Sequence, residues 1–77
     1  MPKQIIVPNL GNEVLEAEVM EWMIEEGQVI RSGEVVVTIS TSKTEIEIES
    51  PSDGILATIL VREGELTTPG SILGEIQ

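Results

Sequence analysis

Residues 35–50 read VVVTISTSKTEIEIES, and this stretch decides the fold. In its second half Ile46 and Ile48 alternate strictly with glutamates. This period of two predicts a strand over 44–50 with its isoleucines on one face and its glutamates on the other. The first half is rich in Val and Ile, which suit a pleated, half-buried surface, and predicts a second strand over 35–41.

The gap between these two strands is short, which predicts a β-hairpin with Lys43 at or near its tip. The tip lacks the Asn-Gly or Asp-Gly pair of a type I′ turn, so we expect a type I-like turn. The chain has two lysines, Lys3 and Lys43. Lys43 has small polar neighbours, Ser42 and Thr44, and is expected to project into solvent. From the residues alone, an ordinary turn lysine and an amine presented for chemistry both remain open.

Glycines and prolines punctuate the rest of the chain at short intervals, with short apolar runs between them. This rhythm is typical of many short strands joined by turns. The further strand candidates are 5–7, 16–24, 55–62 and 71–76, of which 55–62 has apolar residues on both faces and is expected to be buried on both.

The segment 16–24 also fits a helix. Leu15, Val19, Trp22 and Met23 fall on one helical stripe, and Gly27 stands where a helix C-terminal cap is common. Trp22 is interpreted as a hydrophobic residue of the core or its rim.

An internal repeat favours the strand for this segment. The stretch 26–29 (EGQV) matches 63–66 (EGEL) at an offset of 37 residues, while Pro8 and Gly11 match Pro51 and Gly54 at an offset of 43. The first half thus has six extra residues between Gly11 and Gly27, expected as a surface loop near 11–14. Two similar halves predict an all-β sandwich with approximate two-fold symmetry, in which 16–24 is equivalent to the 55–61 strand.

Length and charge narrow the function classes. With 77 residues the chain is expected to be one domain, 1–77, with a modest core and no large enclosed active site. The net charge of −10 disfavours nucleic acids and anionic membranes and suits a basic protein surface. One aromatic residue, Trp22, is too few for stacking on bases.

The chemistry-bearing residues exclude further classes. The sequence has no Cys and no His, so it has no disulfide, no thiolate metal site and no histidine base, and we expect no enzyme activity from this chain alone. The alternating glutamates are interpreted as a solvated strand face, and no metal site is expected. No apolar run reaches about 18 residues and no secretory signal is visible, so we expect a soluble cytoplasmic protein.

The stretch 35–54, together with the Pro-x-x-Gly opening at 8–11 and the Glu21-Trp22 pair, resembles the lipoyl domains of the acyltransferase (E2) component of 2-oxo acid dehydrogenase complexes. The resemblance covers essentially the whole chain. It implies a flattened barrel or sandwich of two four-stranded antiparallel sheets (a barrel-sandwich hybrid) with lipoic acid attached covalently to Lys43 at the hairpin tip. Ser42 and Thr44, which stand where lipoyl domains usually have Asp and Ala or Val, are expected to fix the turn through hydroxyl-to-backbone bonds.

The same resemblance implies a carrier rather than a catalyst. Its partners would be a thiamine-diphosphate-dependent 2-oxo acid decarboxylase (E1), the E2 catalytic core, dihydrolipoamide dehydrogenase (E3) and a lipoate-attaching enzyme. A monomeric domain, derived from the N-terminus of a longer multidomain acyltransferase, is expected. The residues expected to be recognised by partners are Gly11, Asn12, Glu13, Val14 and Glu45. The loop 11–14 is expected to lie beside the Lys43 hairpin and to be recognised by the decarboxylase, whereas Glu45 suits basic rims of the partner sites in general.

Two alternatives share the predicted fold. A biotin carrier domain would bear biotin on the same lysine, although such domains usually place Met on both sides of it. An unmodified interaction or adaptor domain would keep Lys43 as a plain amine under all conditions.

Overall fold

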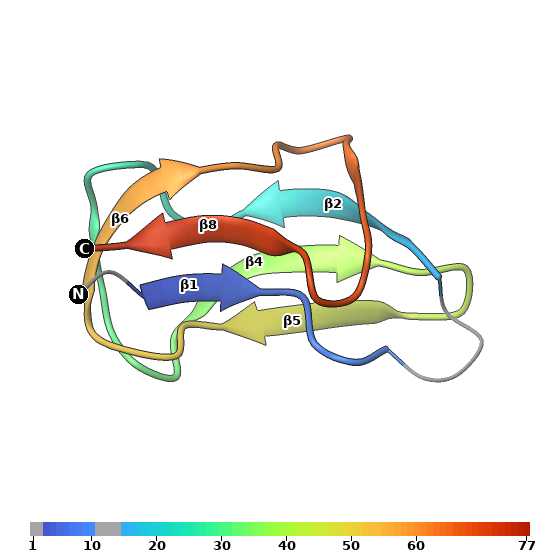
Figure 1. The fold of residues 1–77 in the computed structure, drawn as a ribbon, viewed down its shortest axis with the longest axis horizontal. Helices are drawn as coiled ribbons and strands as arrows, with labels where there is room; N and C mark the ends of the chain where they lie inside the picture. Colours follow the sequence, from blue (N-terminus) through green and yellow to red (C-terminus); the bar gives the residue numbers. More distant parts are fainter. Residues whose placement is uncertain (1–2, 11–14) are drawn as a thin grey trace.

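The computed structural model describes residues 3–10 and 15–77. Every regular element in that part of the chain is a β-strand, which confirms the predicted all-β class (Figure 1). The strands are β1 (Lys3–Ile6), β2 (Ala17–Trp22), β3 (Val29–Ile30), β4 (Val35–Ser40), β5 (Glu45–Glu49), β6 (Gly54–Ile59), β7 (Leu66–Thr67) and β8 (Ile72–Ile76).

The strands form two antiparallel four-stranded sheets, in the orders β1-β8-β6-β3 and β5-β4-β2-β7. Exchanging β1 with β5, β2 with β6, β3 with β7 and β4 with β8 converts one order into the other. The predicted two-fold symmetry is therefore confirmed. The structure is elongated, with extents of 33 × 20 × 18 Å.

The six extra residues of the first half also lie where the repeat predicts. Ten residues (7–16) separate β1 from β2, and four (50–53) separate the equivalent strands β5 and β6, a difference of six. The segment 11–14 itself lies outside the described residues.

The turns repeat in both halves at the level of single hydrogen bonds. The Gly27 N–H donates to the Leu56 carbonyl at 2.7 Å, and the Gly64 N–H donates to the Val19 carbonyl at 2.8 Å. Both glycines have positive φ, 93° and 87°, a conformation that side chains disfavour. Each turn thus ties one half of the chain to a strand of the other half.

The segment 16–24 contains the strand β2, so the helix alternative is wrong. Ala17 and Val19 are buried, and the register of β2 against β4 shifts between Val19 and Glu21. This irregularity admits one extra residue, Met20, and brings Trp22 back to the inner face. Trp22 is half-buried against the core and donates its indole N–H to the Val61 carbonyl at 2.8 Å, as expected of a rim hydrophobe.

The core lies between the two sheets and draws on both halves of the chain. Among the described residues, twelve hydrophobic side chains are buried there: Ile5, Val7, Ala17, Val19, Ile30, Val36, Val37, Ile39, Ile48, Leu56, Leu73 and Ile76. The alternation in β5 is confirmed, because Ile46 and Ile48 face this core and the glutamates between them are exposed. The expected two-sided burial of 55–62 is wrong: Leu56 is buried, whereas Ile55 is 43% exposed.

Two of the eight strands that the resemblance implies, β3 and β7, are not among the strand candidates read from the residues. β3 and β7 have two residues each, and they form one edge of each sheet. In the part of the chain that the structure describes, no helix has the length and apolar character needed to cross a membrane.

Candidate functional site

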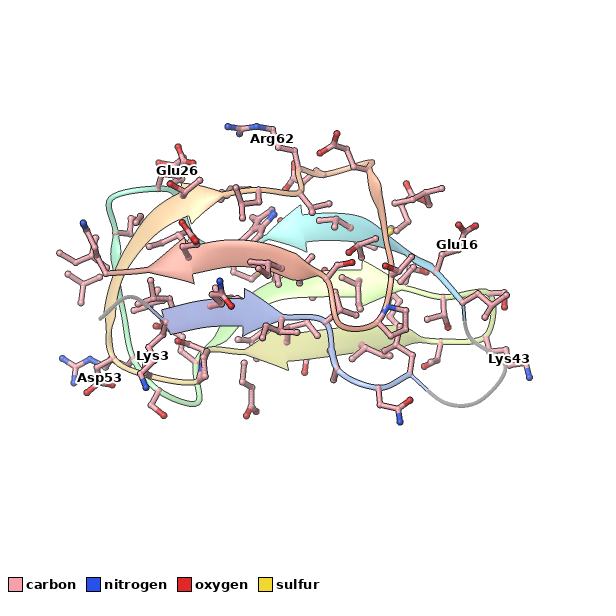
Figure 2. The ribbon with its side chains drawn as sticks, in the orientation of Figure 1. Lys3, Glu16, Glu26, Lys43, Asp53 and Arg62 are labelled. Carbon is pink, nitrogen blue, oxygen red and sulfur yellow. The ribbon has the colours of Figure 1, made fainter. Side chains whose placement is uncertain are left out.

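Lys43 lies in the turn that joins β4 to β5, as the sequence predicts. Ser42, Lys43 and Thr44 are all exposed. Figure 2 shows Lys43 at one extreme of the long axis, and Figure 1 shows the C-terminal end of β8 toward the other. The lysine is therefore presented at one end of the elongated sandwich.

The hairpin holds this turn on paired strands. Ser40 pairs with Glu45, and the backbone N–H of Thr41 donates to the Thr44 carbonyl at 2.8 Å. β4 also pairs with β2 on its other side, so one strand of the hairpin lies inside the sheet, while β5 forms its edge.

The hydroxyl of Thr41 organises the turn. Its Oγ1 accepts the backbone N–H of Lys43 at 3.2 Å and that of Thr44 at 3.1 Å. It also donates to the Thr44 carbonyl at 3.1 Å. A threonine hydroxyl that accepts the N–H two residues ahead forms an ST-turn, which fixes local backbone direction without glycine. The backbone direction at Lys43 thus depends on the side chain of Thr41.

The expected roles of the flanking residues are only partly confirmed. The Thr44 hydroxyl does bond to backbone, donating to the Glu45 carbonyl at 3.3 Å. The expectation for Ser42 is wrong, because its exposed hydroxyl makes no hydrogen bond in the described structure. The main hydroxyl of the turn, however, belongs to Thr41, which the prediction omitted. Its signal was present in the sequence, because a Ser or Thr two residues before a turn centre is a common turn former. Non-glycine residues with positive φ are absent from the described chain, which excludes the type I′ turn, as predicted.

The expected recognition residues are only partly described. Glu45 is exposed as the first residue of β5, directly after the turn. Gly11, Asn12, Glu13 and Val14 lie outside the described residues. The residues that follow them, Leu15 and Glu16, do share a surface hollow with the hairpin residues Ser40, Thr41 and Ser42.

No other feature of the described chain offers chemistry of its own. Within residues 3–10 and 15–77, no group of three or more acidic side chains is arranged to hold a metal ion. The sequence supplies no thiol and no imidazole. What the site provides is a primary amine on a fixed turn, suited to forming an amide with a carboxylic acid.

Comparison with known proteins gives this geometry a context. Residues 3–76 match the biotin/lipoyl family described as "Biotin-requiring enzyme". The chain is 35% identical over 72 residues to the dihydrolipoyllysine-residue succinyltransferase component of the 2-oxoglutarate dehydrogenase complex of Buchnera aphidicola, covering 94% of this chain and 18% of that protein. It is 36% identical over 73 residues to the dihydrolipoyllysine-residue acetyltransferase component of the acetoin cleaving system of Bacillus subtilis, covering 95% and 18%.

Solved structures agree with the fold. The lipoyl domain of the 2-oxoglutarate dehydrogenase complex from Azotobacter vinelandii superposes with a TM-score of 0.78 at 27% identity, covering 96% of this chain and 94% of that one. Urea carboxylase from Kluyveromyces lactis gives a TM-score of 0.84 at 17% identity, over all of this chain and 6% of that one, a likeness of fold alone.

A two-fold β sandwich with an exposed lysine at the tip of a β-hairpin defines the class of cofactor-attachment domains. This chain belongs to the biotinyl/lipoyl-attachment family and is a lipoyl domain of the kind found in E2 acyltransferase components. It spans about a fifth of the length of the curated relatives named above.

The ST-turn makes a prediction about the motion of the turn. Thr41→Val removes the hydroxyl at nearly constant shape, whereas Thr41→Ser keeps it. A hydrogen bond of about 1 kcal/mol corresponds to about a fivefold change in local opening. We therefore expect the amides of Lys43 and Thr44 to exchange with solvent about fivefold faster in Thr41→Val and at the original rate in Thr41→Ser, measured by NMR. Equal exchange in both variants would show that the Thr41 hydroxyl does not hold the turn.

Proposed function

We propose that this chain is a lipoyl carrier domain in which lipoate is joined through an amide to Nζ of Lys43. The carrier takes acyl groups and reducing equivalents between the active sites of a 2-oxo acid dehydrogenase complex. The observation that carries the proposal is the exposed position of Lys43 on a fixed turn at one extreme of the molecule.

The residues around Lys43 fit such a group. Ser42 and Thr44 are small, polar and exposed, so they leave the amine accessible to an attaching enzyme. Amide formation joins Nζ to the carboxyl carbon of lipoate, releases the group that activates the carboxyl, and removes the positive charge of the lysine. The net charge of the chain, −10 before attachment, becomes more negative by one. The attached dithiolane supplies the redox and acyl-carrying chemistry that a chain without cysteine lacks.

The chain itself contributes a mount. The Thr41 hydroxyl and the β4–β5 pairing fix the backbone at the start of the arm, and the attached lipoyl chain would extend the lysine side chain from there. A flexible arm on a fixed base raises the effective concentration of its tip at each site within reach. The domain thus confines a reactive group to one assembly without catalysing any step.

We further propose the partners that this role requires. They are a thiamine-diphosphate-dependent decarboxylase, an acyltransferase core, dihydrolipoamide dehydrogenase and a lipoate-attaching enzyme. The naming of relatives as components of 2-oxoglutarate dehydrogenase and acetoin cleaving systems supports this set.

The test separates lipoate from biotin. The purified chain is incubated with lipoate, ATP and a lipoate-attaching enzyme, and in parallel with biotin, ATP and a biotin-attaching enzyme. We expect intact-mass analysis to show one lipoyl addition and no biotinyl addition. A biotinyl addition alone would favour the carboxylase type of carrier. No addition in either reaction would favour an unmodified interaction domain.

A further inference from the structure

The two-fold symmetry allows the outer faces of the two sheets to be compared position by position. Their strands correspond, and their turn hydrogen bonds and strand irregularities repeat at equivalent residues. A difference in charge between the faces is therefore not required by the fold. We call the outer side of β5-β4-β2-β7, the sheet that bears the Lys43 turn, the hairpin face.

The two faces differ strongly in charge. The strands of the hairpin-face sheet contain five glutamates and no lysine or arginine; these glutamates are Glu18, Glu21, Glu45, Glu47 and Glu49. The strands of the other sheet contain one glutamate and one lysine, Glu75 and Lys3. The formal charges are thus −5 and 0 in two sheets of equivalent geometry.

The equivalent positions show that these glutamates are not needed for the sandwich. The two-fold relation matches Glu18 with Ile55 and Glu21 with Thr58, each 37 residues later. It matches Glu47 with Gln4, 43 residues earlier. Neutral residues at the same places build the other sheet.

The glutamates of the hairpin face stand in rows across the sheet. Thr38 of β4 pairs with Glu21 on one side and Glu47 on the other, and Ser40 pairs with Glu18 and Glu45. In each row a neutral residue of β4 separates the two glutamates, so the rows form an extended negative surface. Contact with positively charged side chains of a partner would be favourable there.

The same face combines charge with accessible apolar surface. A shallow hollow is lined by Met20, Glu21, Met23, Thr38, Glu45, Glu47 and Glu63. Met20 and Met23 are 44% and 45% exposed. Methionine is common at binding surfaces because its side chain adapts to different shapes. The face also leads directly to the turn, since Glu45 follows it.

We propose that the hairpin face is the docking surface for the enzyme that attaches the cofactor to Lys43, and that this enzyme presents lysine and arginine side chains to it. This inference rests on the proposed function. An attaching enzyme binds the chain before any arm exists, so it has only protein surface to recognise. The hairpin face leads directly to the target lysine. It is also the face whose strands carry a formal charge of −5, whereas the strands of the equivalent sheet carry a formal charge of 0.

Two double variants of equal charge test the proposal. Glu21→Gln with Glu47→Gln neutralises two glutamates of the hairpin face. Glu25→Gln with Glu75→Gln neutralises one turn glutamate and one on the opposite sheet. The measured quantities are kcat and KM for lipoylation of the unmodified chain, at about 0.02 M and about 0.5 M salt, since screening by salt weakens such contacts. At low salt we expect kcat/KM to fall about fivefold through KM in the hairpin-face variant, and less than twofold in the control.

At high salt the two variants should converge. Equal losses of kcat/KM in both variants at low salt would show that only the net charge matters. No loss of kcat/KM in either variant would show that the hairpin face is not recognised. Each of these results would overturn this inference and leave the proposed function intact. A wild-type chain that is not lipoylated at all would overturn both.

Discussion

Lys43→Arg should abolish covalent modification of the chain completely. Arginine keeps the positive charge, but its guanidinium stays protonated under all protein conditions and does not act as the amine for amide formation. Because Lys43 is exposed on a turn, the free energy of unfolding should change by no more than about 0.5 kcal/mol. The expected pattern is a chain that unfolds as before and shows no mass increase with lipoate, ATP and the attaching enzyme.

Lys3→Arg is the matched control. Lys3 is the other lysine of the chain, lies in β1, and appears far from Lys43 along the molecule (Figure 2). This variant should gain one lipoyl group at the original rate. Modification that persists in Lys43→Arg and disappears in Lys3→Arg would show that Lys3, and not Lys43, is the attachment site.

Leu56→Ala should destabilise the domain more than any surface change. Leu56 is fully buried in β6 between the two sheets. Truncating such a leucine costs about 2–5 kcal/mol through lost burial and the cavity left behind. A domain of this length has about 4–12 kcal/mol of total stability, so the loss is a large fraction of it. The measurement is the unfolding midpoint in urea, read from the fluorescence of Trp22.

Leu66→Ala provides the comparison for the same chemical change. Leu66 is 62% exposed in β7, so its truncation should cost less than about 1 kcal/mol. A Leu56→Ala variant as stable as Leu66→Ala would mean that the core is not where the structure places it.

The hairpin and the two-fold architecture were predictable from sequence because their signals are local or repeated. The alternation over 44–50 has a period of two and no interruption, so it defines both a strand and its buried face. The sequence matches at offsets of 37 and 43 residues then indicate that the two halves of the chain have equivalent strands.

The segment around β2 was ambiguous for a physical reason. The irregularity at Met20 changes the spacing of inward side chains, which are Ala17, Val19 and then Trp22. The interval of three residues from Val19 to Trp22 is one that a helical stripe also has. The repeat was needed to favour a strand, because it makes this segment equivalent to the 55–61 strand. That equivalent strand, β6, has the same irregularity, between Leu56 and Thr58.

Other features were beyond local patterns. β3 and β7 have two residues each, too few to show any period, and they exist because they pair with β6 and β2. The exposure of Ile55 depends on which face of β6 meets the core. The sequence does not show this, because apolar residues occur on both faces of that strand. The role of Thr41 depends on hydrogen bonds within the turn, whereas the sequence marks Ser42 and Thr44 only as the direct neighbours of Lys43.

Mass spectrometric mapping of the protein purified from its own cells tests most directly whether this turn carries the cofactor. After proteolysis, we expect the peptide that contains Lys43 to bear a single lipoyl group and the peptide that contains Lys3 to bear none. A Lys43 peptide that carries biotin, or that remains wholly unmodified in cells whose dehydrogenase complexes are active, would contradict the assignment of this chain as a lipoyl carrier.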